Sequence, residues 1–324
     1  MQVTTGSLPR IVGPVPILDA KFSVERLRSR ILMRLQSFSA MASRQMFQAH
    51  RELWSGEPEI ALLKLLCDPG KVSLDIGANR GIYTYWLARY SASVIAFEPS
   101  AAYCSRLRSA SPTNVDVRQC TVSDATGSGM LRVPMVDGRM EFGLSTLEGT
   151  NSLGGLDARQ IDVRKYALDD LGLSNVGMIK IDVEGHELSV LQGALGLLKR
   201  ERPRLVIELE ERYRPHAANS ARELLERLGY QGFFLMEDRL HGIAEFDPAT
   251  MQDPDRLSSL YINNFIFAQI GDTDWMPAVT VPAIGAARRR LRAWRNRTVP
   301  GIVRTRRPDT PGGHRRSGGP RSVF

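Results

Sequence analysis

The segment VSLDIGANRG at residues 72–81 constrains the fold of this chain more than any other stretch. It begins as a mostly apolar run typical of a buried strand, and Gly77 and Gly81 then predict a tight turn into a helix. A second apolar run at residues 94–97 ends at Glu98. A carboxylate about twenty residues beyond such a turn accepts hydrogen bonds from ribose hydroxyls in nucleotide-binding α/β folds. The two segments therefore predict the first half of a nucleotide-type cofactor site.

The loop favours S-adenosyl-L-methionine over a dinucleotide. It lacks the G-x-G pair that lets a pyrophosphate rest on a helix N-terminus, and it carries the anionic Asp75. Asp75 would repel a pyrophosphate but suits the cationic amino-acid end of S-adenosyl-L-methionine. We expect this end to be held by Asp75, Gly77, Asn79 and Gly81, and the ribose by Glu98. A nicotinamide oxidoreductase, and a strand-turn-helix that binds no ligand, stay open as alternatives.

Strands and helices alternate after residue 72, which predicts a mostly parallel, doubly wound α/β sheet with helices on both faces. We expect strands over residues 72–76, 94–97, 115–122, 129–133, 178–181, 205–209, 232–236 and 261–268. The expected helices cover 81–90, 101–110, 187–199 and 217–228. Residues 134–165 show no clear period and are predicted to form a long loop, the best candidate for a lid that selects the substrate.

A second motif, MIKIDVEGHE at residues 178–187, places acidic and histidine side chains where a strand ends. The carboxyl ends of strands face the ligand crevice in such sheets, so Asp182, Glu184 and His186 should surround the substrate. His186 is the natural general base, because its ordinary pKa lies near working pH. Asp182 or Glu184 would orient it or replace it. The alternative is that Lys180 and Asp182 form a structural ion pair and Glu184 caps the helix.

Asp182, Glu184 and Glu208 together resemble a set of ligands for a hard divalent cation. We predict that no metal is bound. The three cysteines are scattered without a C-x-x-C pair, which fits reduced thiols in the cytoplasm. The N-terminus shows no secretory signal.

The formal net charge of +8 is concentrated at the two ends of the chain. Residues 284–324 carry +11 and residues 1–50 carry +5, so the remainder carries −8. Because the expected catalytic body is acidic, nucleic acid is a poor substrate candidate. The basic ends fit peripheral contact with an anionic surface. Apolar residues between 21 and 54 recur at helical spacing, which predicts an amphipathic helix or helix pair packed on the body or on a second copy in a homo-oligomer. A helix that lies on a membrane surface is the alternative.

Taken in order, these motifs resemble the FkbM-family methyltransferases over residues 59–268. The resemblance is carried by DIGANRGIYT at 75–84, AFEP at 96–99, VSD at 122–124 with Gly127, ALDDL at 167–171, IKIDVEGHE at 179–187, LQGA at 191–194 and INNF at 262–265. It implies a class I methyltransferase Rossmann-like fold with an antiparallel last strand. It also implies methyl transfer from S-adenosyl-L-methionine to a hydroxyl of a sugar, glycolipid or polyketide-type product. In that setting Asp124 and Ser123 would meet the adenine edge.

The chain is therefore predicted to contain three parts: an irregular and helical extension at 1–58, a methyltransferase domain at 59–270, and a largely disordered Arg-rich tail at 271–324. A nucleic-acid methyltransferase assisted by the tail is one further alternative. Base-flipping enzymes commonly carry a Pro-Pro-aromatic loop after the fourth strand, whereas residues 182–185 read DVEG. The other alternative is a scaffold protein that has this fold but no catalytic activity.

Overall fold

The computed structural model describes residues 57–149, 151–237, 239–253 and 261–276. The predicted helical extension at 1–58 lies outside the described residues except for its last two positions, and so does almost all of the predicted tail at 271–324. The predictions of disorder in the tail and of contact between the basic ends and an anionic surface therefore stay predictions. No helix among the described residues is long and apolar enough to cross a membrane.

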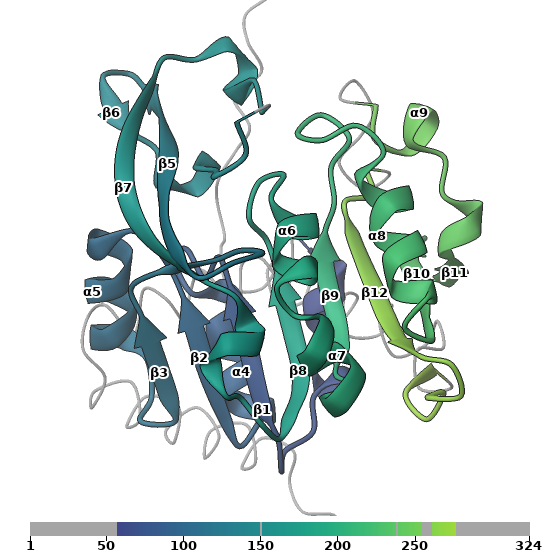
Figure 1. Ribbon diagram of the computed structural model, residues 1–324. Helices are drawn as coiled ribbons and strands as arrows, with labels where there is room; N and C mark the ends of the chain where they lie inside the picture. The colour runs from purple at the N-terminus through teal and green to yellow at the C-terminus, as the bar shows by residue number, and fades with distance from the viewer. Residues whose placement is uncertain (1–56, 150, 238, 254–260, 277–324) are drawn as a thin grey trace, which may run out of the picture.

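An eight-stranded sheet forms the centre of the molecule (Figure 1). Its strand order is β11-β10-β12-β9-β8-β1-β2-β3. The strands are β1 (Val72–Ile76), β2 (Ser93–Phe97), β3 (Val115–Arg118), β8 (Val176–Ile181), β9 (Arg204–Glu208), β10 (Tyr230–Met236), β11 (Arg239–Gly242) and β12 (Asn264–Gln269). β1 pairs in parallel with β2 and β8, while β12 runs antiparallel between β9 and β10. This confirms the predicted class I Rossmann-like sheet.

Helices cover both faces of the sheet because its central strands are buried on both sides (Figure 1). One apolar cluster packs α6 (Glu187–Gln192), α7 (Leu195–Glu201) and α8 (Ala217–Glu226) against strand residues such as Leu74 and Ile179. Another packs η1 (Pro58–Leu62), α3 (Leu63–Leu66) and α4 (Ile82–Tyr90) against Met178 and Val206. A smaller cluster joins α5 (Ala101–Ala110) to β2 and β3.

A second sheet, with strand order β4-β7-β5-β6, stands above one end of the central sheet (Figure 1). Its strands are β4 (Thr121–Val122), β5 (Gly127–Val136), β6 (Arg139–Met140) and β7 (Ala158–Tyr166). β5 and β7 pair antiparallel from Gly127 opposite Lys165 to Pro134 opposite Ala158. We call residues 127–166 the arm. The short turns η2 (Phe142–Leu144) and η3 (Leu153–Gly155) lie in the segment that joins its strands.

The predicted loop at 134–165 is therefore wrong, because β5 continues to Val136 and β7 begins at Ala158. The predicted strand at 115–122 is divided into β3 and β4, which belong to different sheets. The predicted helix at 187–199 is also interrupted, and α6 ends at Gln192. At the break, a Cβ on Gly193 would lie only 2.0 Å from the carbonyl oxygen of Ser123.

Three smaller differences concern the end of the domain. The last strand begins at Asn264 instead of residue 261, and β11 was not predicted. Since β11 pairs antiparallel with β10, the sheet contains a second reversed strand. The turn η4 (Leu168–Leu171), the turn η5 (Ile243–Glu245) and helix α9 (Pro248–Met251) complete the described elements.

Candidate active site

A cavity lies between the carboxyl ends of the central strands and the arm. The central sheet contributes residues after β1, β2 and β8, and the arm contributes residues from β5 and from the segment at 142–147. The lining residues include Gly77, Asn79, Glu98, Asp182, Glu184 and His186, together with Leu131, Phe142, Ser145, Thr146 and Leu147. The arm thus forms one wall of the cavity. Its predicted role as a lid that selects the substrate stays a prediction.

The glycine loop after β1 leaves no room for a side chain at its first position. Gly77 has φ +81°, and a Cβ there would lie 1.8 Å from the carbonyl oxygen of Asp182. Asn79 follows in the left-handed conformation, with φ 49°. Its side-chain Oδ1 is buried in the cavity wall without a hydrogen-bond partner among the described residues. This amide oxygen is an acceptor available to a ligand.

Glu98 lies beside the loop at the end of β2 and is 4% exposed. Its Oε2 accepts a hydrogen bond of 2.8 Å from the Asn79 backbone N–H, and its Oε1 accepts one of 2.8 Å from Ser100. Burial raises the pKa of Glu98 to about 7, against these hydrogen bonds. Because each oxygen has a second lone pair, the carboxylate keeps capacity for the two hydroxyls of a ribose.

The turn at residues 182–186, which we call the catalytic turn, carries strained backbone. Glu184 adopts φ 53°, a left-handed conformation uncommon outside glycine. The buried side chain of Glu187 stabilises the turn, since its Oε1 accepts hydrogen bonds from the backbone of Gly185 (2.9 Å) and Val183 (3.3 Å). Burial raises the pKa of Glu184 to about 8. Glu184 therefore carries a proton for much of the time at neutral pH.

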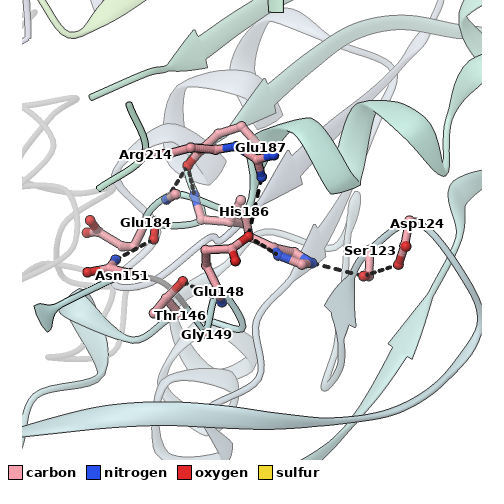
Figure 2. Close-up of polar contacts among 12 residues, drawn as sticks. Ser123, Asp124, Thr146, Glu148, Gly149, Asn151, Glu184, His186, Glu187 and Arg214 are labelled. Carbon is pink, nitrogen blue, oxygen red and sulfur yellow. Dashed lines mark hydrogen bonds and ion pairs between the residues drawn. The ribbon is translucent and has the colours of Figure 1, made fainter. Parts of the chain in front are cut away.

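His186 lies between two polar partners, as Figure 2 shows. Its Nε2 is 2.9 Å from Ser123 Oγ, and its Nδ1 is 3.8 Å from Glu148 Oε2. Nδ1 is buried and has no hydrogen-bond partner among the described residues. Burial lowers the pKa of His186 below its ordinary value, so the ring is neutral near pH 7. A neutral ring with an unpartnered nitrogen can accept a proton from a substrate.

The arm is tied directly to the catalytic turn. Asn151, which is 2% exposed, donates a hydrogen bond of 2.8 Å from Nδ2 to the carbonyl oxygen of Glu184 (Figure 2). Arg132 on β5 in turn donates from Nη1 to three carbonyl oxygens of the same segment, those of Glu148 (3.2 Å), Gly149 (3.1 Å) and Asn151 (2.7 Å). This single guanidinium therefore sets the path of the chain that places Glu148 and Asn151 at the site.

Comparison with known proteins identifies the domain. The family model described as the methyltransferase FkbM domain matches residues 75–233. Residues 75–233 form an FkbM methyltransferase domain. The match includes the glycine loop, Glu98, the arm and the catalytic turn, which together enclose the cavity. No curated protein sequence matches the chain.

Solved methyltransferases are among the similar structures. The methyltransferase FkbM from Methylobacillus flagellatus KT is 16% identical, with a TM-score of 0.41 over 76% of this chain and 60% of its own. An rRNA methylase from Streptococcus thermophilus is 12% identical, with a TM-score of 0.38; the match covers 65% of this chain and 94% of the methylase. A SAM dependent methyltransferase from Aquifex aeolicus is 17% identical, with a TM-score of 0.36; the match covers 71% of this chain and 98% of that enzyme. This chain thus spans 60% of the length of the first of these proteins.

Four of the predicted site residues of the FkbM domain do not line the cavity. Asp75 is 2% exposed and accepts a hydrogen bond from Thr84 of α4, and burial raises its pKa to about 6. Gly81 forms the N-terminal end of α4, with φ +81°. Ser123 contacts Nε2 of His186, and Asp124 accepts a hydrogen bond from Ser123. The cofactor contacts predicted for these four residues stay predictions.

The orientation of His186 differs from the expected one. Its recorded side-chain partners are Ser123 and Glu148, whereas the sequence suggested Asp182 or Glu184. Arg214 contacts the same Glu148 oxygen at 3.3 Å. Glu148, Asn151 and Arg214 were not predicted. A carboxylate, an amide and an arginine in aperiodic segments give no signal of their own. The folded arm brings Glu148 and Asn151 to the turn, while Arg214 comes from the segment between β9 and α8.

The predicted ion pair between Lys180 and Asp182 is present as part of a wider buried cluster. Lys180 is 1% exposed, and its Nζ lies 4.0 Å from Asp182, 3.9 Å from Glu208 and 3.1 Å from Asn264 Oδ1. The same ammonium lies 4.6 Å from the centre of the Tyr83 ring. Within the described part of the FkbM domain, no cluster of His, Cys, Asp and Glu side chains is arranged to hold a metal ion.

Proposed function

We propose that this protein transfers a methyl group from S-adenosyl-L-methionine to a hydroxyl oxygen of a sugar, glycolipid or polyketide-type acceptor, with His186 as general base. One observation carries the proposal. The lining of one cavity includes the free amide oxygen of Asn79, the buried carboxyl group of Glu98, and His186, whose Nδ1 faces Glu148 at 3.8 Å without a hydrogen bond among the described residues. The first pair suits a cofactor, and the imidazole suits an acceptor whose proton must be removed.

The residues present fit the cofactor. The Asn79 Oδ1 is a buried acceptor without a partner, which the cationic amino group of the methionine end would satisfy. Glu98 would receive the ribose hydroxyls, and Gly77 keeps the loop close to the catalytic turn. The Asp182 carboxyl group also lines the cavity and favours a cation. Bound S-adenosyl-L-methionine supplies an activated methyl group on a good leaving group.

The chain would contribute positioning and proton removal. Leu131, Phe142 and Leu147 from the arm form an apolar wall, while Ser145 and Thr146 add hydroxyls. Such a mixture suits an acceptor with both hydroxyl groups and apolar surface. Placing the acceptor beside the methyl donor provides much of the acceleration. His186 Nδ1 then accepts the hydroxyl proton during attack.

Anionic acceptors are disfavoured by the same geometry. Asp182 and Glu184 line the cavity, and Glu148 lies 3.8 Å from the ring of His186. A phosphate backbone would meet carboxyl groups on approach, so nucleic acid is not our proposed acceptor. All three cysteines, Cys67, Cys104 and Cys120, are free and buried. Free thiols support the reducing cytoplasm as the place where the enzyme works.

Calorimetric titration with S-adenosylmethionine, S-adenosylhomocysteine and NAD in parallel tests the cofactor. We expect the two adenosyl ligands to bind and NAD to remain silent. Asn79→Ala should weaken adenosyl binding by about 10- to 100-fold, the range for a lost hydrogen bond to a charged group. The exposed Asn219→Ala on α8 is the matched control and should bind as the wild type does. Binding of NAD alone would overturn the proposal.

A screen with radiolabelled methyl donor over glycans and polyketides then tests the acceptor. His186→Gln should bind S-adenosylhomocysteine normally and lose turnover by about 100-fold or more, as expected for a general base. Methylation by His186→Gln at the wild-type rate would contradict the assigned base while leaving methyl transfer itself in place.

A further inference from the structure

We infer that Ser123 and Asp124 form the exit path by which the proton taken up by His186 reaches solvent. The inference rests on the proposed function, because methylation of a hydroxyl releases a proton. The site where this happens is buried: the His186 side chain is 12% exposed, and Ser123 is 1% exposed. The Asp124 side chain, by contrast, is 50% exposed. The three side chains therefore run from the cavity wall to the surface (Figure 2).

The hydrogen bonds set the direction of the path. Ser123 Oγ donates to Asp124 Oδ1 at 2.9 Å, and a carboxylate can only accept. The single hydroxyl proton of Ser123 is thereby used, so its oxygen must accept from His186 Nε2 at 2.9 Å. This places the proton of the neutral ring on Nε2 and leaves Nδ1 bare. The ring is thus held in the tautomer that a base acting through Nδ1 requires.

The step balances in atoms and charge. The donor S–CH3 bond and the acceptor O–H bond break, an O–CH3 bond forms, and the acceptor proton moves to Nδ1. The Nε2 proton then passes to Ser123 Oγ, and the Ser123 proton passes to Asp124 Oδ1. Hydrogen bonds from Ser123 and Lys165 lower the pKa of Asp124, so the carboxyl group hands its proton to water. Each group ends with as many protons as at the start, but the ring proton now lies on Nδ1. It must return to Nε2 by exchange with solvent before the next turnover.

Two contacts hold the backbone of Ser123 in place. Its backbone N–H donates to the carbonyl oxygen of Tyr166 on β7 at 3.0 Å. Gly193, at the break between α6 and α7, packs so closely that a Cβ would lie 2.0 Å from the Ser123 carbonyl oxygen. The helix break left unexplained by the sequence thus positions the serine between histidine and aspartate.

Other charged groups also act on His186. Glu148 faces Nδ1 at 3.8 Å and would stabilise the protonated ring, and Arg214 lies 3.3 Å from the same carboxylate oxygen. Lys165 lies 3.3 Å from Asp124 and opposes protonation of the ring. The pH behaviour of His186 therefore reflects these four groups together, and the exit path is better tested by following its proton directly.

The test is NMR spectroscopy of the full chain with ¹⁵N-labelled histidine, using His186→Gln to assign the ring. We expect the neutral ring to carry its proton on Nε2. In Asp124→Asn the serine keeps an oxygen to donate to, so the tautomer should persist. An amide cannot take up the proton, so exchange of the Nε2 proton with water should slow by about 100-fold. Ser123→Ala should abolish the tautomer preference.

Asp162→Asn is the matched control, because Asp162 is an exposed carboxylate on β7 opposite Met130. It should leave both the tautomer and the exchange rate unchanged. Wild-type exchange in Asp124→Asn, or a proton on Nδ1 in the wild type, would overturn the inference. If Asp124 instead contacts adenine, as the sequence suggested, Asp124→Asn would weaken S-adenosylhomocysteine binding and leave exchange unaltered. Failure of all adenosyl ligands to bind the wild type would reject the proposed function, a result separate from these.

Discussion

The side-chain amide of Asn151 donates a 2.8 Å hydrogen bond to the backbone carbonyl of Glu184, and so joins the arm to the catalytic turn. Glu184 has φ 53°, and residues held in this region cost about 1–3 kcal/mol that the surroundings must offset. Asn151 supplies part of that support from a position that is 2% exposed. The conformation of the turn therefore depends on the arm being in place.

Asn151→Ala should lower the free energy of unfolding by about 1–3 kcal/mol, because it leaves a buried carbonyl unsatisfied. Urea denaturation measures the loss. Asn219→Ala removes a similar amide from an exposed helix position and should change stability by less than about 0.5 kcal/mol. Equal effects of the two substitutions would show that Asn151 does not support the turn.

Gly77→Ala should lower the free energy of unfolding by about 3 kcal/mol or more, because the new Cβ combines a positive φ with overpacking against the Asp182 carbonyl. It should also abolish binding of S-adenosylhomocysteine. Gly138→Ala separates the two causes, since Gly138 has φ +72° but open space around it. That control should cost only about 1–2 kcal/mol. Similar losses in both variants would contradict the steric argument.

Lys180→Met should lower stability by about 3–5 kcal/mol, because it leaves Glu208 buried without its cation. The loss should shrink as pH falls, since burial already raises the pKa of Glu208 and the carboxyl group then takes up a proton. Adding Glu208→Gln to Lys180→Met should recover much of the loss at neutral pH. A double-mutant cycle by chemical denaturation measures the coupling, and the exposed Lys199→Met is the control.

Stability should fall as pH rises from about 4, the ordinary pKa of these carboxyl groups, to about 8. Burial raises the folded-state pKa of several carboxyl groups above their ordinary values, so their contribution is complete at low pH and lost as they ionise. The groups are Asp75 (about 6), Glu98 (about 7), Glu187 (about 7) and Glu184 (about 8). Glu184→Gln should flatten the upper part of this fall.

Urea denaturation at a series of pH values checks this dependence. The exposed Glu223→Gln on α8 serves as the control and should follow the wild-type curve. A Glu184→Gln curve with the same slope as the wild type between pH 5 and pH 8 would show that the pKa of Glu184 is not raised in the folded state.

The central sheet could be predicted because its signals are local. Each signal is contained in a stretch of a few residues: the apolar run of β1, the turn at Gly77, and the acidic residue Glu98 at the end of β2. The arm could not be predicted in the same way. Met130 pairs with Asp162 across more than thirty residues, and β7 alternates partly buried and exposed positions without an apolar period.

The predicted site residues that line the cavity follow strands, whereas the arm residues close to His186 gave no signal in the sequence. Gly77, Asn79, Glu98 and the catalytic turn line the cavity as expected. Glu148 and Asn151 approach the catalytic turn in a segment whose backbone carbonyl groups accept hydrogen bonds from Arg132. The break at Gly193 likewise depends on contact with Ser123, which is distant in sequence.

The arm is one continuous stretch of chain, residues 127–166, inserted between β4 and β8. The parts assigned to the cofactor come from β1 and β2, before this stretch begins. Under the proposed function, the glycine loop and Glu98 hold the methyl donor, whereas the arm supplies an apolar wall for the acceptor. Substitutions within the arm would then change the acceptor wall without altering the glycine loop or Glu98.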